Sequence, residues 1–140
     1  HLSDQPVEQG GLLIGRAWLG GTSRQPKAVS HVSVEKAVPA GDADGTAIAL
    51  RMETSVWSAA RAALRPGQLI VGWYHSHPGL TAFFSDTDRR TQKAFFNHDY
   101  SIGWVIDPWT GAEALFIGPD CEPIGRGPQA VATAQPGNAD

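Results

Sequence analysis

Residues 73–89 read WYHSHPGLTAFFSDTDR, and this stretch is the most informative segment of the sequence. An apolar run over residues 69–74 leads into it and predicts a strand, which a Pro-Gly pair ends. His75 and His77 lie two residues apart at the end of that strand. Because side chains two apart in a strand share a face, we expect the two imidazoles to lie side by side.

Ser85 and Asp88 mark the start of the next element, a helix predicted over residues 85–97. A serine followed three residues later by an acid is typical of a helix N-terminus, where the hydroxyl caps backbone N–H groups. The same helix start can place Asp88 opposite the two histidines. Two histidines and one carboxylate leave a coordination position open, as catalytic zinc sites do. Each residue also has a structural interpretation: the histidines as ordinary structural residues, and Ser85 with Asp88 as a helix cap. A capping Asp88 can still bind a metal ion.

The rest of the chain mixes strand and helix patterns, which predicts a single α/β domain. Glycine pairs flank the apolar run 11–19, which predicts a strand buried on both faces. Residues 53–64 show helical spacing up to a Pro-Gly stop. Further strands are predicted over residues 28–38, 47–51, 101–106 and 112–117, the last two as a hairpin. Residues 125–140, rich in Gly, Pro, Ala and Gln, are expected to be a flexible tail or linker after a domain of residues 1–124.

Composition argues against several function classes. The 140 residues carry 11 Lys and Arg against 14 Asp and Glu, so the net charge is -3 and no basic surface for nucleic acid is expected. No apolar run approaches the length of a membrane-spanning helix, which predicts a soluble protein with no membrane partner. The single cysteine, Cys121, is expected to be a buried, unreactive thiol, and the lack of a disulfide pair favours a cytoplasmic protein.

The sequence resembles the JAMM signature of the MPN-plus (JAB-type) zinc metalloproteases, which is His-x-His, seven residues, then Ser-x-x-Asp. His75, His77, Ser85 and Asp88 match this signature in register. The family also carries a glutamate just before a glycine-rich apolar strand, and Glu8 in PVEQGGLLIG matches it. The resemblance covers most of the chain and implies the cytidine-deaminase-like MPN fold, with a central mixed β-sheet flanked by helices. Within this family, the sequence resembles a bacterial or archaeal-type, deubiquitinase-like member.

The resemblance also implies a mechanism. His75, His77 and Asp88 would bind one Zn2+ per chain, with a water as the fourth ligand. Glu8 would take a proton from this water and pass it to the leaving amine, and Ser85 would donate to the substrate carbonyl oxygen. The implied reaction is hydrolysis of the peptide or isopeptide bond after the C-terminal tail of a ubiquitin-like or sulfur-carrier protein.

Some features keep two interpretations. The loop 39–46 fits either a clamp for a substrate tail or a plain connection between strands. The aromatic residues Phe83, Phe84 and Trp109 fit either a docking surface or a cover for the core. The chain is compatible with a dimer and with a place in a larger multidomain protein.

Two other function classes compete with the protease. One is a non-catalytic MPN scaffold subunit, although such relatives have typically lost the zinc ligands that this chain keeps. The other is a non-haem iron enzyme, although its usual motif places the carboxylate beside the first histidine. Glu35 and Glu53 are alternative candidates for the general base, but solvated surface charge fits both better because no glycine-rich strand follows them.

Overall fold

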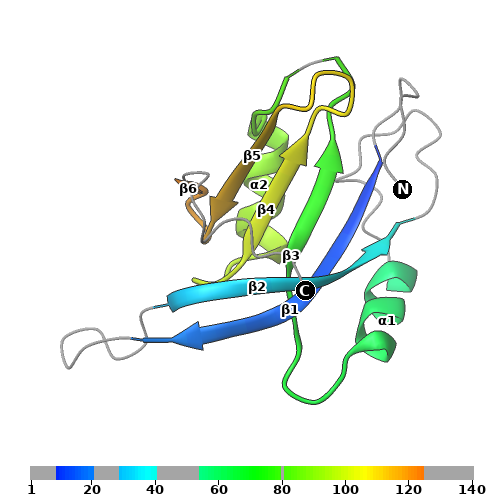
Figure 1. The fold of residues 1–140 in the computed structure, drawn as a ribbon, viewed down its shortest axis with the longest axis vertical. Helices are drawn as coiled ribbons and strands as arrows, with labels where there is room; N and C mark the ends of the chain where they lie inside the picture. The colour runs from blue at the N-terminus through cyan, green and yellow to red at the C-terminus, as the bar shows by residue number, and fades with distance from the viewer. Residues whose placement is uncertain (1–8, 21–28, 41–53, 80, 125–140) are drawn as a thin grey trace.

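The strand β3 (Leu69–Ser76) lies inside a mixed sheet and carries the histidine pair at its end. The computed structural model describes residues 9–20, 29–40, 54–79 and 81–124, and within them the sheet has six strands in the order β2-β1-β3-β4-β5-β6 (Figure 1). The other strands are β1 (Gly10–Leu19), β2 (Val29–Pro39), β4 (Ile102–Ile106), β5 (Glu113–Ile117) and β6 (Glu122–Ile124). The described helices are α1 (Thr54–Ala63) and α2 (Asp86–Phe95).

One parallel pair makes this sheet mixed. β3 runs parallel to β4, whereas β1 is antiparallel to both β2 and β3, and β5 is antiparallel to both β4 and β6. Parallel strands need a crossover connection, and α2 supplies it between β3 and β4. In the resulting register Ser76 pairs with Ile106, so the end of β3 lies beside the end of β4.

Alternate residues of the central strands build an apolar cluster on each face of the sheet. On one face Trp73 packs with Val56 and Ala60 of α1 and with Phe96 at the end of α2. The opposite face is built by a second cluster, whose buried members are Leu13, Val71, Tyr74, Ile102 and Leu115. His75 stacks on Trp73 and therefore lies on the face that the helices cover.

The fold prediction from the sequence is confirmed as a single small α/β domain with a mixed sheet. The helix predicted over residues 53–64 is α1, and the helix predicted over 85–97 is α2 with Ser85 as its cap. The predicted strand 28–38 and the hairpin 101–106/112–117 are present with ends shifted by a residue or so. The predicted strand 47–51 lies outside the described residues. Sequence patterns missed β6, which is only three residues long and contains a proline.

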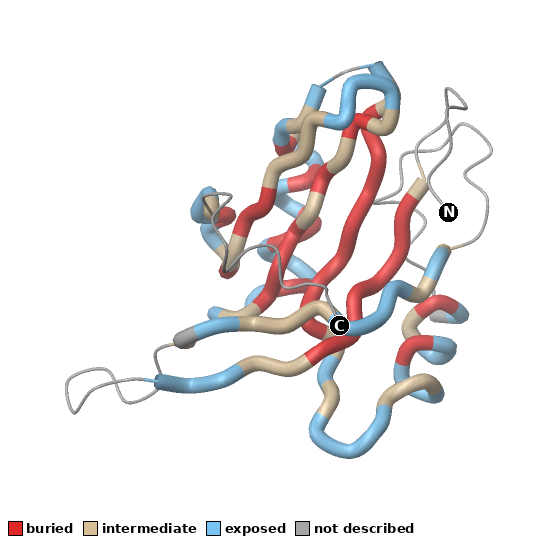
Figure 2. The backbone as a smooth tube through the Cα atoms, in the orientation of Figure 1, coloured by how far each residue is buried: buried red, intermediate tan, exposed pale blue. Residues whose placement is uncertain are grey.

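The burial expected for residues 11–19 is half wrong. The first half of β1 is buried between β2 and β3, but its second half extends beyond β3 with β2 as a two-stranded ribbon (Figures 1 and 2). Trp18 and Leu19 are consequently 40% and 60% exposed. A run of apolar residues thus predicts the strand but not how far the neighbouring strands continue alongside it. In the described part of the chain neither helix is long and apolar enough to cross a bilayer.

Candidate metal centre

The backbone at the end of β3 is held from both sides. Ser76 N–H donates to Gln9 O and His77 N–H donates to Ile106 O, each at 2.8 Å. His75 and His77 are 0% and 4% exposed, and their rings lie edge to face with centroids 4.8 Å apart. The expectation that the two imidazoles lie side by side is confirmed.

Ser76, between the two histidines, has a role that sequence reasoning missed. Its Oγ accepts the backbone N–H of Gln9 at 2.9 Å, so both the main chain and the side chain of Ser76 bind Gln9. Gln9 follows Glu8 in the sequence, and Glu8 itself lies outside the described residues. The alternation of side chains along a strand could have signalled that Ser76 faces away from the histidines.

Ser85 and Asp88 position the third member of the cluster. Ser85 Oγ accepts the Asp88 N–H at 3.1 Å, and Asp88 Oδ2 accepts the Ser85 N–H at 2.9 Å, which completes a capping box at the start of α2. The predicted cap is therefore confirmed. It fixes the carboxylate of Asp88, which is buried, so that Oδ2 lies 3.2 Å from His75 Nε2 and 3.6 Å from His77 Nε2.

The surroundings of Asp88 favour its charged form. Burial alone would raise the pKa of Asp88. The neighbouring His75, together with hydrogen bonds to the backbone and the side chain of Ser85, instead holds this pKa below its ordinary value. A buried carboxylate facing two buried imidazoles offers one oxygen and two nitrogen ligands, and these ligand atoms lie within 4.8 Å of one another. Both ring nitrogens of His75 are buried: Nε2 faces Asp88 Oδ2 at 3.2 Å, and Nδ1 has no hydrogen-bond partner within the described residues. This donor set fits a divalent cation such as zinc.

A buried polar network behind the cluster was also missed from the sequence. The His75 ring stacks on Trp73 with centroids 4.7 Å apart, and Trp73 Nε1 donates to Gln92 Oε1 at 2.6 Å. Gln92 Nε2 in turn donates to the backbone carbonyls of Ser101 and Gly118. Gln92 follows Asp88 by four residues and so lies on the same face of α2, which is the only signal the sequence offered.

The structure distinguishes among the three aromatic residues left open by the sequence. Phe84 is 7% exposed and belongs to the core, so for Phe84 the core interpretation holds. Phe83 is 45% exposed and its ring lies 5.0 Å from that of His77. Trp109 is 52% exposed, and its ring lies so close to Gly79 that a Cβ there would be 2.8 Å away. Exposed aromatic side chains therefore lie at the rim of the cluster.

Neither Glu35 nor Cys121 belongs to the His-His-Asp cluster. Glu35 is an exposed residue of β2 that pairs with Arg16 at 3.3 Å, as expected of a surface charge, and Glu53 lies outside the described residues. Cys121 is buried, and burial raises the pKa of its thiol, in line with the expected unreactive cysteine. Of the proposed clamp, residues 41–46 lie outside the described residues.

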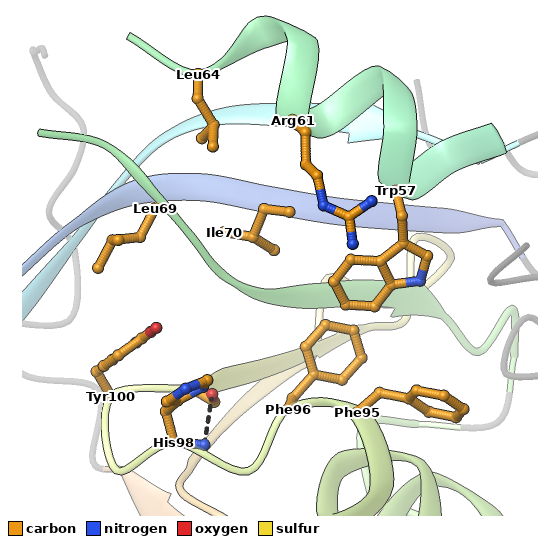
Figure 3. A pocket seen from close by; sticks show the side chains of 10 residues that line it. Trp57, Arg61, Leu64, Leu69, Ile70, Phe95, Phe96, His98 and Tyr100 are labelled. Atoms are coloured by element: carbon orange, nitrogen blue, oxygen red, sulfur yellow. Dashed lines mark hydrogen bonds between the residues drawn. The ribbon is translucent and has the colours of Figure 1, made fainter. Parts of the chain in front are cut away.

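A groove of about 340 Å³ lies at the other end of β3. Its walls come from α1, from Leu69 and Ile70 at the start of β3, and from the end of α2, with Arg61 placed over the Trp57 ring (Figure 3). None of its lining residues belongs to the His-His-Asp cluster. The groove and the candidate metal centre are therefore separate features.

The fold is a small α/β domain that places two histidines at a strand end and an aspartate at the start of the next helix, and these three residues could hold a metal ion. Comparison with known protein families identifies the family. A family model described as prokaryotic homologues of the JAB domain matches residues 1–114, and the chain therefore belongs to the JAB/MPN family.

Three curated relatives illustrate this membership. The chain is 35% identical over 103 residues to the NAD(+) hydrolase TcpA of a Theionarchaea archaeon, covering 73% of this chain and 28% of that protein. It is 45% identical over 42 residues to the ubiquitin carboxyl-terminal hydrolase RPN11 of Saccharomyces cerevisiae, covering 29% and 14% of the two chains. It is 29% identical over 110 residues to the 26S proteasome regulatory subunit rpn11 of Schizosaccharomyces pombe, covering 74% and 32%. The matched part thus spans about a third or less of each of these relatives.

Proposed function

We propose that this chain is a zinc-dependent hydrolase that cleaves the peptide or isopeptide bond after the C-terminal tail of a ubiquitin-like or sulfur-carrier protein. The observation that carries the proposal is the buried cluster of His75, His77 and Asp88 directly beside the half-buried Ser85. The similarity to a ubiquitin carboxyl-terminal hydrolase supports the substrate class.

The proposed roles follow from the chemistry of the residues. His75, His77 and Asp88 would hold one Zn2+, which when bound activates water and polarises a carbonyl group. Glu8 is proposed as the general base that takes the proton and later passes it to the leaving amine. Ser85 Oγ accepts the Asp88 N–H, so its own O–H proton is available to donate to the developing negative charge on the carbonyl oxygen.

The exposed aromatic rim offers a place for the substrate. Phe83 packs against His77 and Trp109 packs against Gly79, so a tail reaching the cluster would pass these two side chains. We propose that they contact apolar side chains of the substrate protein. Large aromatic groups contribute much of the binding energy at protein interfaces, which supports this assignment.

The proposal extends to the organisation of the chain. Residues 1–124 are proposed as the catalytic domain, in line with a family match over residues 1–114 and a last described strand ending at Ile124. Residues 125–140 are proposed as a tail or linker, and the short coverage of its relatives supports a place in a larger protein. The lone cysteine supports a reducing compartment, the cytoplasm.

The test combines metal content with turnover. Elemental analysis of the purified chain should give about one zinc per chain, and the chain should cleave a ubiquitin-like protein fused through its tail to a reporter. His77→Ala should lose both zinc and cleavage. Glu8→Gln should keep zinc and the fold but lose cleavage by about 100- to 10,000-fold.

Other results would replace the proposal. Bound iron in place of zinc would favour a non-haem iron enzyme, and no bound metal would favour a scaffold subunit. Because one relative is an NAD(+) hydrolase, the same preparations should be assayed for NAD+ consumption. Consumption of NAD+ that survives in His77→Ala, without any tail cleavage, would also contradict the proposal.

A further inference from the structure

A buried carboxylate next to the cluster has no part in the mechanism proposed above. Asp107 directly follows β4 and is fully buried. Resting on the proposed zinc site, we propose that Asp107 is a positioning residue: it holds the turn that leaves His77 and thereby fixes the histidine pair relative to Ser85 and Asp88.

The carboxylate of Asp107 binds three backbone N–H groups. Oδ1 accepts the N–H of Gly79 at 3.0 Å and that of Trp109 at 2.9 Å, and Oδ2 accepts the N–H of Thr81 at 3.0 Å. Gly79 is two residues beyond His77, and Thr81 is four residues before Ser85. One side chain therefore holds the middle of the connection between the ligand-bearing strand and the ligand-bearing helix.

Asp107 is itself firmly placed. Its N–H donates to Ala112 O and its carbonyl accepts the N–H of Gly111, each at 2.8 Å, inside the turn between β4 and β5. The preceding residue, Ile106, accepts the N–H of His77. The end of β4 thus binds both the second histidine and the turn that follows it.

The turn contains one residue in a costly backbone conformation, Thr81. Gly79 has φ 75° and Thr81 has φ 62°, and a left-handed conformation is costly for a β-branched residue such as threonine. Hydrogen bonds to a buried carboxylate offset such strain, because charged acceptors bind backbone N–H groups strongly. Without the carboxylate the turn is expected to relax and to shift Ser85 and Asp88 relative to β3.

A displacement of Asp88 relative to the two histidines should lower the affinity for zinc. Zinc sites require ligand atoms placed within about 0.2 Å of their preferred distances, and replacing a residue that orients the ligands typically lowers affinity by about 10- to 100-fold. A residue that contributed only to stability would leave the affinity of the folded protein unchanged. Zinc affinity therefore separates positioning from a merely structural role.

The experiment measures zinc dissociation constants by chelator competition for the wild type and Asp107→Asn, with amide hydrogen exchange of the metal-free proteins. The amide protons of Gly79 and Thr81 should be protected in the wild type. In Asp107→Asn the Thr81 amide should lose protection, because its acceptor Oδ2 is replaced by an NH2 group. Zinc should bind about 10- to 100-fold more weakly to the variant. The matched control is Ser101→Ala, which removes another buried acceptor of a loop N–H, that of His98, at the opposite end of β4.

Each outcome decides a separate point. Wild-type zinc affinity in Asp107→Asn, or an equal loss in Ser101→Ala, would overturn the inference while leaving the zinc site intact. A wild type that binds no zinc would overturn the proposed function, and the inference with it. If Asp107→Asn does not fold, Gly79→Ala disturbs the same turn while retaining the carboxylate, because its Cβ would meet the Trp109 ring at 2.8 Å and its φ is positive. Unchanged zinc affinity in Gly79→Ala, or fast exchange at Thr81 in the wild type, would then overturn the inference.

Discussion

Ser85 and Asp88 cap each other at the start of α2, and the Asp88 oxygen that accepts the Ser85 N–H, Oδ2, is the one that lies 3.2 Å from His75 Nε2. The same oxygen atom, Asp88 Oδ2, therefore both caps the helix and faces the histidine as a candidate metal ligand. The cap removes rotational freedom from the carboxylate before any metal arrives. Such preorganisation lowers the cost of binding an ion, and it connects helix capping to the chemistry of the site.

The first prediction separates the two roles of Ser85. Ser85→Ala should lower the free energy of unfolding by about 1 kcal/mol, because the Asp88 N–H loses its acceptor. Zinc content should be unchanged, whereas cleavage of a ubiquitin-like fusion should fall by about 100- to 1,000-fold, the usual effect of removing an oxyanion donor. Ser85→Thr, which keeps a hydroxyl, is the control and should retain most of the activity. Full cleavage by Ser85→Ala would remove Ser85 from the proposed mechanism.

The second prediction concerns the network behind His75. Gln92→Leu should lower the free energy of unfolding by about 2–4 kcal/mol, because the Trp73 N–H and the carbonyls of Ser101 and Gly118 lose a buried partner. Urea denaturation followed by tryptophan fluorescence measures this change. Lys93→Ala, at an exposed position of the same helix, is the control and should change stability little. A Gln92→Leu variant as stable as the wild type would show that the network is dispensable.

How much of the site the sequence predicts depends on how local its interactions are. His75 and His77 follow from the period of a strand, and Ser85 and Asp88 follow from a helix cap, so short-range rules bring all four to notice. The carboxylate of Asp107 and the amide of Gln92 also form specific buried hydrogen bonds, but most of their partners are distant in the sequence. Asp107 binds Gly79 across 28 positions and Gln92 binds Gly118 across 26. No local pattern encodes such pairs.

The fold shows the same division. Apolar patterns predict nearly every described element, because a helix or outer strand buries one stripe or face and a central strand is a short continuous apolar run. They do not predict that β1 and β2 extend past β3 as an exposed ribbon, since that depends on where β3 begins in another part of the chain. These patterns also do not distinguish Phe83 from Phe84, because only the tertiary structure determines which of the two is buried.

The third prediction is a pH dependence that arises from Asp107. Burial alone would raise the pKa of Asp107, but the N–H groups of Gly79, Trp109 and Thr81 lower it from 3.8 to about 2. Because the folded-state pKa is the lower one, the ionised carboxylate stabilises the fold above about pH 4, and this contribution is lost as the pH falls towards about 2.

Asp107→Asn makes that contribution measurable. The variant should be less stable than the wild type at about pH 6, and the difference in free energy of unfolding should narrow between about pH 4 and pH 2. Other carboxylates, including Asp88, titrate in both proteins and largely cancel in the comparison. Urea titrations at several pH values measure the difference. A gap that stays constant down to about pH 2 would show that the Asp107 carboxyl is not ionised preferentially in the folded state.

The last prediction tests the aromatic rim as a substrate surface. Trp109→Ala should raise KM for a ubiquitin-like fusion by about 5- to 30-fold, since removing an interface tryptophan costs about 1–2 kcal/mol of binding. The value of kcat should change little, because Trp109 is proposed to bind the substrate and not to act on the reacting bond. Trp18→Ala is the matched control: Trp18 is a tryptophan of comparable exposure, on the ribbon of β1 and β2, and its loss should leave KM unchanged. Zinc content should be measured for both variants, because the Trp109 ring packs on Gly79, two residues from His77. A fall in kcat with unchanged KM would instead indicate that Trp109 acts through the turn that Asp107 holds.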